Sequence, residues 1–139
     1  MFVHLYVRRG VALIPTTGLT KSGLYVDVEP VEVVSISDRS ALRLAIERAA
    51  SRGNPPVPEP GRSPATASVV LKLAKSRSWS EFERSASTWA IDETGGRLRI
   101  IAYRPSEEGG WEEDPQRLEV LPPTSGIQEA ALRLATLIS

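Results

Sequence analysis

The stretch TWAIDETGGRLRIIAY, residues 88–103, decides the fold of this chain. Apolar and polar side chains alternate over residues 88–93 and again over residues 97–103, which is the period-two pattern of β-strands. Between these two segments, Thr94-Gly95-Gly96 forms a glycine-rich turn that permits positive φ angles. The stretch therefore predicts an antiparallel hairpin, against which the other elements of the chain must pack.

The N-terminal third predicts further strands. Its alternating or continuously apolar segments are residues 2–7, 11–14, 24–28 and 31–36. We expect a hairpin between the first two, with Pro15 ending the second strand and Glu29-Pro30 making a tight turn between the last two. Tyr25 and Asp27 are expected on an outer, polar face. The first 36 residues therefore predict a meander of three or four strands.

Capping patterns mark the starts of three helices. Asp38 is a good N-cap for the first helix, which Gly53 ends, while Ser78 and Ser125 each begin a capping box for a later helix. Trp79 is expected to be substantially buried against the sheet. The expected apolar faces, in chain order, are Leu42, Ala45, Ile46 and Ala49; Trp79, Phe82 and Ala86; and Ile127, Ala131, Leu134 and Ile138.

The remaining segments complete the prediction. Residues 68–73 read as a strand, residues 104–116 as a loop, and residues 117–121 as a last short strand. Residues 55–64 contain five prolines, which favours an extended loop within one domain. We therefore predict a single α+β domain spanning residues 1–139, with a mainly antiparallel sheet and about three helices packed on one of its faces.

The composition limits the classes of binding partner and the cellular compartment that we expect for this protein. The 139 residues contain 17 Lys and Arg against 17 Asp and Glu, so net charge gives no argument for nucleic acid or a membrane surface as a partner. The chain has no Cys, which is typical of a reducing compartment. The apolar stretch near the N-terminus is too short for a signal peptide or a membrane span. We expect a cytoplasmic protein.

Catalytic and cofactor motifs are scarce. His4 is the single imidazole, and its place in a predicted strand favours a partly exposed histidine at the edge of the sheet over a catalytic one. One His without Cys argues against a zinc site, and neither phosphate-binding glycine motif is present. We expect no catalytic residue, no metal and no cofactor, hence a non-enzymatic protein-binding module. The alternative is a small hydrolase or nucleic-acid-processing enzyme that uses carboxylates or Arg.

The candidate partner-binding segment is acidic. Residues 105–115 carry five carboxylates and no Lys or Arg, with an aromatic side chain at the centre: Glu107, Glu108, Trp111, Glu112, Glu113 and Asp114. Trp111 could anchor a partner, since aromatic side chains are enriched among binding hot spots. The alternative is an exposed loop whose Trp111 folds back onto the sheet. A basic excess also occurs over residues 62–84, but Trp79 and Phe82 there are expected in the core, which argues against direct nucleic-acid binding.

Several strings along the chain carry a family resemblance: TKSGLYVDVEPV at 20–31, RGNP at 52–55, VLK at 70–72, SWSEFE at 78–83, and Trp89. Together they resemble small bacterial immunity proteins of contact-dependent growth inhibition systems. The resemblance implies a cytoplasmic protein made beside a toxin, whose C-terminal domain, often a nuclease, it neutralises by stoichiometric binding. An acidic surface would suit the basic cleft of such a toxin. The oligomeric state stays open.

Overall fold

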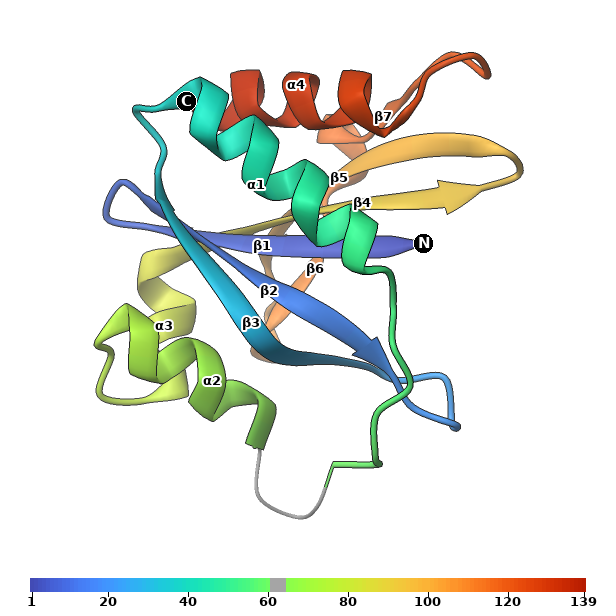
Figure 1. Ribbon diagram of the computed structural model, residues 1–139. Helices are drawn as coiled ribbons and strands as arrows, with labels where there is room; N and C mark the ends of the chain where they lie inside the picture. Colours follow the sequence, from blue (N-terminus) through green and yellow to red (C-terminus); the bar gives the residue numbers. More distant parts are fainter. Residues whose placement is uncertain (61–64) are drawn as a thin grey trace.

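An antiparallel sheet runs through the middle of the computed structural model, which describes residues 1–60 and 65–139 (Figure 1). Within these residues the strands are β1 (Phe2–Arg8), β2 (Val11–Leu19), β3 (Tyr25–Ser35), β4 (Ala86–Thr94), β5 (Arg97–Pro105), β6 (Trp111–Glu113) and β7 (Glu119–Val120). The helices are α1 (Arg39–Arg52), α2 (Ala65–Ala74), α3 (Trp79–Ser85) and α4 (Ile127–Ile138), with a 3-10 turn η1 (Pro115–Arg117). The strand order is β3-β2-β1-β4-β5-β6, and β7 also pairs with β5. The predicted α+β class with an antiparallel sheet is confirmed.

The hairpin that decided the prediction is formed by β4 and β5. Thr94 pairs with Arg97, and Gly95 and Gly96 make the two-residue turn with φ angles of 60° and 75°. Positive φ at both turn positions matches the right-handed twist of the flanking strands. In the same hairpin Ile91 pairs with Ile100, and both side chains are fully buried. The hairpin therefore contributes directly to the core.

The N-terminal strands are longer than the sequence indicated. β2 continues through Pro15, and β3 continues through Glu29-Pro30, so the predicted strand end and tight turn are both wrong. Pro15 pairs with Val31, and the register then shifts, which leaves Glu29 and Pro30 unpaired in a β-bulge. Proline is tolerated at a bulge because its missing N–H would take no ladder hydrogen bond there.

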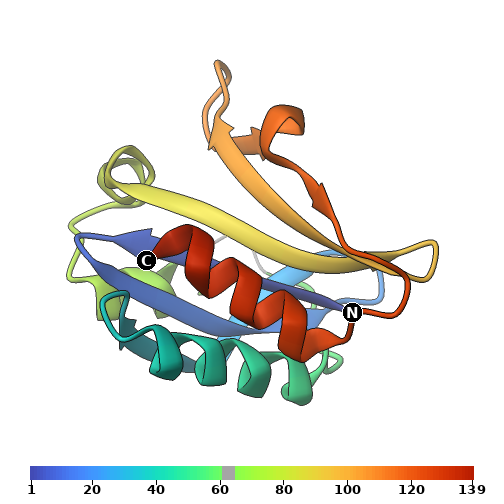
Figure 2. The ribbon, with the colours of Figure 1, turned by 90° about the horizontal axis from the view of Figure 1, so that it is seen from above.

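Helices cover both faces of the sheet, not one face as predicted. α1 and α4 lie side by side over one face (Figure 2), whereas α2 and α3 pack on the other (Figure 1). The central strands consequently bury both sets of side chains: Leu5 and Ile14 belong to the α1/α4 core, while Tyr6 and Leu13 belong to the α2/α3 core. Asp27, expected on an outer face, is only 6% exposed for the same reason.

The long helices agree closely with their sequence patterns. All four expected residues of α1, Leu42, Ala45, Ile46 and Ala49, are buried, the Asp38 carboxylate accepts a hydrogen bond from the Ala41 N–H at 3.1 Å, and the helix ends at Gly53. In α4 the N-cap is Gly126, one residue later than predicted, and its N–H donates to Glu129 Oε2 at 2.8 Å. The predicted Ser125–Gln128 capping box is therefore wrong by one residue.

Two other segments differ from the prediction. Residues 68–73 lie in helix α2, not in a strand, because a short apolar run does not distinguish a buried strand from a helix. Part of the expected loop 104–116 is strand β6, and the last strand shortens to β7. The proline-rich segment 55–64 lies partly outside the described residues. No helix in the described part of the chain is long and apolar enough to cross a membrane.

Candidate functional site

The predicted acidic segment folds as a hairpin, which we call the acidic hairpin and define as residues 105–115. β6 pairs with the end of β5, with Arg104 opposite Glu112 and Pro105 opposite Trp111. The turn is closed by the Ser106 N–H, which donates to the Gly110 carbonyl at 3.0 Å. Five of the six candidate residues are thus held on β6 and the turn before it, and Asp114 follows β6 as the N-cap of η1.

Arginines from neighbouring positions neutralise part of the acidic hairpin. Arg104 Nε lies 3.3 Å from Glu112, Arg99 lies 3.9 Å from Glu113, and Arg117 Nε donates to Asp114 at 2.9 Å. The hydrogen bond from Arg117 lowers the pKa of Asp114 below its usual value.

The tip of the acidic hairpin is different. Glu107 and Glu108 are exposed, and neither forms an ion pair with a basic side chain of the described residues. Since the three carboxylates on or after β6 have arginine neighbours, the unbalanced negative charge is concentrated at this tip.

Trp111 folds back onto the sheet. Its ring centroid lies 5.8 Å from that of Tyr6, 5.7 Å from Trp79 and 6.4 Å from Phe82. Phe82 is fully buried, whereas Trp111 and Trp79, which was expected to be substantially buried, are half-buried. The Gly110 N–H donates to Glu83 Oε2 at 3.4 Å. The aromatic cluster and this contact hold the acidic hairpin against α3.

His4 lies on the central strand β1, so its predicted place at a sheet edge is wrong. Its Nε2 is hydrogen-bonded to Asp27 Oδ1, and the Tyr6 hydroxyl donates to Asp27 Oδ2 at 2.6 Å. Burial, with the nearby Asp27 carboxylate as a second cause, raises the pKa of Tyr6 well above its usual value. Three polar groups thus satisfy one another's hydrogen bonds inside the fold. The alternation of Asp27 with Val26 and Val28 placed it on the opposite, polar face, so the local pattern gave no sign of its burial.

Metal ligation finds no support in the part of the chain that the structure describes. No three His, Cys, Asp or Glu side chains there gather closely enough to hold an ion.

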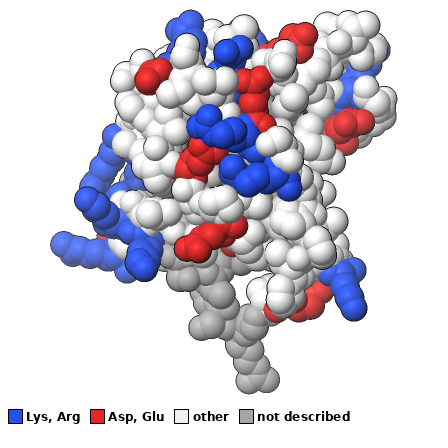
Figure 3. Space-filling view, in the orientation of Figure 1, with Lys and Arg blue, Asp and Glu red and all other residues white. Residues whose placement is uncertain are grey.

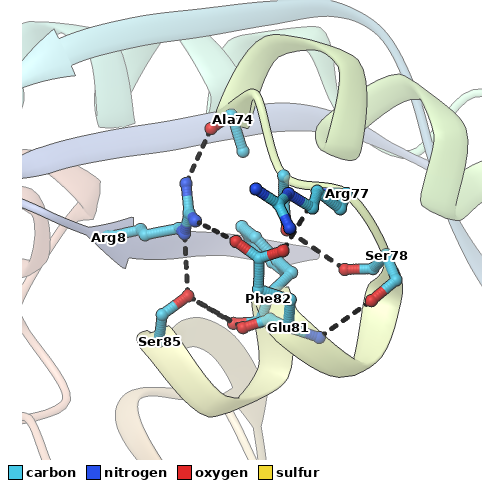
Figure 4. Close-up of polar contacts among 8 residues, drawn as sticks. Arg8, Ala74, Arg77, Ser78, Glu81, Phe82 and Ser85 are labelled. Carbon is cyan, nitrogen blue, oxygen red and sulfur yellow. Dashed lines mark hydrogen bonds and ion pairs between the residues drawn. The ribbon is translucent and has the colours of Figure 1, made fainter.

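A buried arginine joins β1 to both helices of the second face (Figure 4). Arg8 is 5% exposed; its Nη1 donates to the Ala74 carbonyl at 2.7 Å, its Nε to Ser85 Oγ at 2.7 Å, and its Nη2 to Glu81 Oε1 at 3.2 Å. Ser78 caps α3 as predicted, because its hydroxyl accepts from the Glu81 N–H at 3.2 Å. In a capping box, the Glu81 carboxylate would accept a hydrogen bond from the Ser78 N–H. Here it accepts instead from the Arg77 N–H at 3.3 Å and forms an ion pair with Arg8.

The position of α2 creates a groove beside Arg8, which we call the cationic groove. It has a volume of about 360 Å³ and lies between the β1–β2 turn, β3 and the C-terminal end of α2. Its apolar lining comes from Val11, Leu13, Val33 and Leu73, and its charged lining from Arg8, Arg9 and Lys75. In Figure 3 basic side chains gather along the left side of the molecule, over the β1–β2 turn and the α2–α3 connection. The sequence indicated the basic excess around Lys75 but not its place beside Arg9.

The chain matches no protein-family model and no curated protein. Its fold is similar to that of a protein of unknown function from Neisseria meningitidis, with a TM-score of 0.64 and 14% sequence identity over 96% of this chain and 92% of that one. It is also similar to a chain of the CdiA-CT/CdiI toxin and immunity complex from Yersinia pseudotuberculosis, with a TM-score of 0.63 and 14% identity over 98% and 95% of the two chains. At this level of identity the similarity shows a shared fold.

Proposed function

We propose that this protein is a non-enzymatic binding module that neutralises a bacterial toxin domain, as an immunity protein does. The observation that carries the proposal is the fold shared with a chain of a toxin and immunity complex. We take the inhibitor as the matching partner, because the strings at 20–31, 52–55 and 78–83 resemble immunity proteins. We place the protein in the cytoplasm, where it binds the toxin domain and contacts neither nucleic acid nor membrane itself.

The acidic hairpin is the partner surface in this proposal, comprising Glu107, Glu108, Trp111, Glu112, Glu113 and Asp114. A toxin that acts on nucleic acid presents a basic cleft, and an opposing acidic surface accelerates the encounter and disfavours wrong partners. Because Glu107 and Glu108 have no ion-pair partner in the described residues, we expect the tip to contribute most of this effect. Trp111 packs the turn end of the hairpin against α3 and offers the exposed part of its ring for contact.

The decisive experiment uses the toxin gene expected beside the gene for this protein. The C-terminal domain of that toxin is purified with this protein, and the mixture is analysed by size-exclusion chromatography with light scattering. We expect a stoichiometric complex, and we expect cells that express this protein to survive the toxin domain. Absence of both complex and protection would refute the proposal, whereas turnover of a substrate by the isolated protein would favour the enzyme alternative.

The interface is tested by replacing the tip charges. Glu107→Gln with Glu108→Gln should slow association with the toxin domain and reduce its salt sensitivity, because the Debye length falls from about 30 Å at 0.01 M salt to about 8 Å at 0.15 M. A matched control is Glu47→Gln with Glu93→Gln, which removes the same charge from α1 and from the C-terminal end of β4. Equal association rates for the tip variant and wild type would place the interface elsewhere.

A further inference from the structure

We propose that the cationic groove is a second docking site, which binds an apolar side chain flanked by acidic residues on the partner protein. The inference deepens the proposed function and rests on it, because the partner is taken to be the toxin domain. Four observations carry the inference: an apolar floor, two strained cationic positions, unbalanced charge, and the place of the groove relative to the acidic hairpin.

The floor and walls of the groove are aliphatic. Leu13 lies at its base and is 2% exposed, whereas Val33 and Leu73 are 51% and 44% exposed on opposite walls. Covering such side chains removes apolar surface from water, which favours association with an apolar partner group. The volume of about 360 Å³ is at the small end of ligand sites. It therefore suits a few side chains of a protein segment.

Two cations of the groove occupy unusual backbone conformations. Arg9 and Lys75 are the only non-glycine residues with positive φ in the described part of the chain, at 51° and 57°. Asn or Gly would take either conformation at lower cost, particularly at Arg9, which precedes Gly10 in a two-residue hairpin turn. Strained positions of this kind cluster at functional sites. Both strained residues here are basic, and both line the same groove.

The groove carries positive charge that the protein does not balance. Arg8 pairs with Glu81, but Arg9 and Lys75 form no ion pair with any carboxylate of the described residues. An anionic group from a partner would complement these cations. An acidic and aliphatic peptide segment fits better than single-stranded nucleic acid, because nucleic-acid sites use aromatic stacking platforms and the lining of this groove is aliphatic.

The groove and the acidic hairpin flank the same helix. α3 contacts α2, which forms one wall of the groove, and through Glu83 it also contacts Gly110 of the acidic hairpin. Leu13 of the groove and Trp111 of the hairpin belong to the same core cluster on this face of the sheet. One partner lying across α3 can therefore reach both sites, with a basic surface toward the hairpin and an acidic segment toward the groove.

The charge arm of the test uses Arg9→Asn with Lys75→Asn. Asn accepts positive φ, so the double variant keeps both backbone conformations while removing both cations. The matched control is Lys21→Asn with Arg97→Asn, which removes the same charge from exposed positions outside the groove. Against the toxin domain, we expect the groove variant to raise the Kd about tenfold, in the range of hot-spot residues, and the control to leave it within about twofold.

The apolar arm uses Val33→Thr, which keeps the β-branched shape on strand β3 and makes the wall polar. We expect a faster dissociation rate with an unchanged association rate, because apolar anchors act mainly after the encounter. If the wild type binds the toxin domain and neither groove variant changes its binding, the groove inference is refuted while the proposed function stands.

A partner-independent probe separates the two ideas. The peptide Glu-Asp-Leu-Asp-Glu is titrated to millimolar concentration into isotope-labelled protein, with Glu-Asp-Ser-Asp-Glu and a single-stranded oligodeoxythymidine as comparisons. We expect amide NMR shifts at Val33, Leu73 and Lys75 with the leucine peptide, weaker shifts with the serine peptide, and loss of both in the charge variant. No shifts with the leucine peptide, or tighter binding of the oligonucleotide at the same residues, would overturn the inference whatever the toxin does.

Discussion

Replacing Arg8 tests whether one buried guanidinium holds α2 and α3 on the sheet. Arg8→Met keeps an unbranched side chain of similar reach, so the packing of the stem is largely preserved while all three hydrogen bonds are lost. The acceptors of these bonds lie on α2 and α3, and the donor lies on the central strand β1. The substitution therefore loosens one face of the fold selectively.

The expected loss can be built from the individual contacts. The Ala74 carbonyl is left without the guanidinium and costs about 1–3 kcal/mol if it stays dry. Ser85 loses one hydrogen bond, worth about 1 kcal/mol, but its hydroxyl still donates to the Glu81 carbonyl. Glu81 is 31% exposed and regains water, so its ion pair contributes no more than about 1 kcal/mol. The sum is about 3 kcal/mol, which corresponds to a fall in Tm of about 10 °C for a chain of this size.

Urea denaturation followed by tryptophan fluorescence measures this loss, since Trp79 and Trp111 lie in the cluster beside α3. Arg133→Met is the matched control, because it makes the same chemical change at a 47% exposed arginine that pairs with Glu119. We expect a loss below about 1 kcal/mol for the control. Hydrogen exchange should accelerate in α2 and α3 but not in α1 and α4. Equal losses for the two variants, or uniform exchange, would refute the reasoning.

Three further predictions concern other contacts. Trp79→Ala should lower the free energy of unfolding by about 2–3 kcal/mol, less than for a fully buried tryptophan, and a loss below about 1 kcal/mol in chemical denaturation would show that the ring does not support the cluster. His4→Ala should cost about 1–2 kcal/mol, because Asp27 loses a buried partner, yet leave protection against the toxin intact; loss of protection by a folded variant would place His4 in the functional site. Burial alone would raise the pKa of Glu32, but hydrogen bonds from Arg48 and Arg52 outweigh it and lower this pKa. The contribution of Glu32 to folding stability is therefore present above its unfolded pKa of about 4.3 and is lost as pH falls through its folded pKa. Glu32→Gln should therefore cost roughly 0.5–1 kcal/mol in urea titrations near pH 7 and progressively less as pH falls below the unfolded pKa of about 4.3, and a difference that stays constant in acid would contradict this assignment.

The elements that could be predicted are those whose signals are local. The β4–β5 hairpin has its turn in two adjacent glycines, and α1 has its cap, its apolar spacing and its terminal Gly53 within one short segment. Nothing distant has to be known to interpret either pattern. Both elements consequently appear in the structure nearly as expected.

The failures share a non-local cause. Pro15 and Pro30 each predict the end of a strand. Both are accommodated because the register of β2 against β3 shifts directly after Pro15, at the bulge on β3 that contains Pro30. That shift is a property of the strand pair and is invisible in either strand alone. Likewise, residues 68–73 are helical because α3 and Arg8 hold α2 on the second face of the sheet. The prediction had left that face exposed to solvent.

The sequence predicted which residue types make up the candidate site but not how they are arranged in space. The carboxylates of the acidic hairpin are neighbours in the sequence, but Arg99, Arg104 and Arg117 enter through strand pairing and the 3-10 turn. The cationic groove joins Arg9 to Lys75 by way of the contacts of Arg8. Its one sequence signal is an arginine before Gly10, in a hairpin turn where Asn would be the favoured residue.

Overall neutrality therefore does not make this protein electrostatically neutral toward a partner. Glu107 and Glu108 at the hairpin tip, and Arg9 and Lys75 at the groove, lie on either side of α3. A partner near the surface meets two opposite charges in a fixed arrangement, which favours one docking orientation over its reverse.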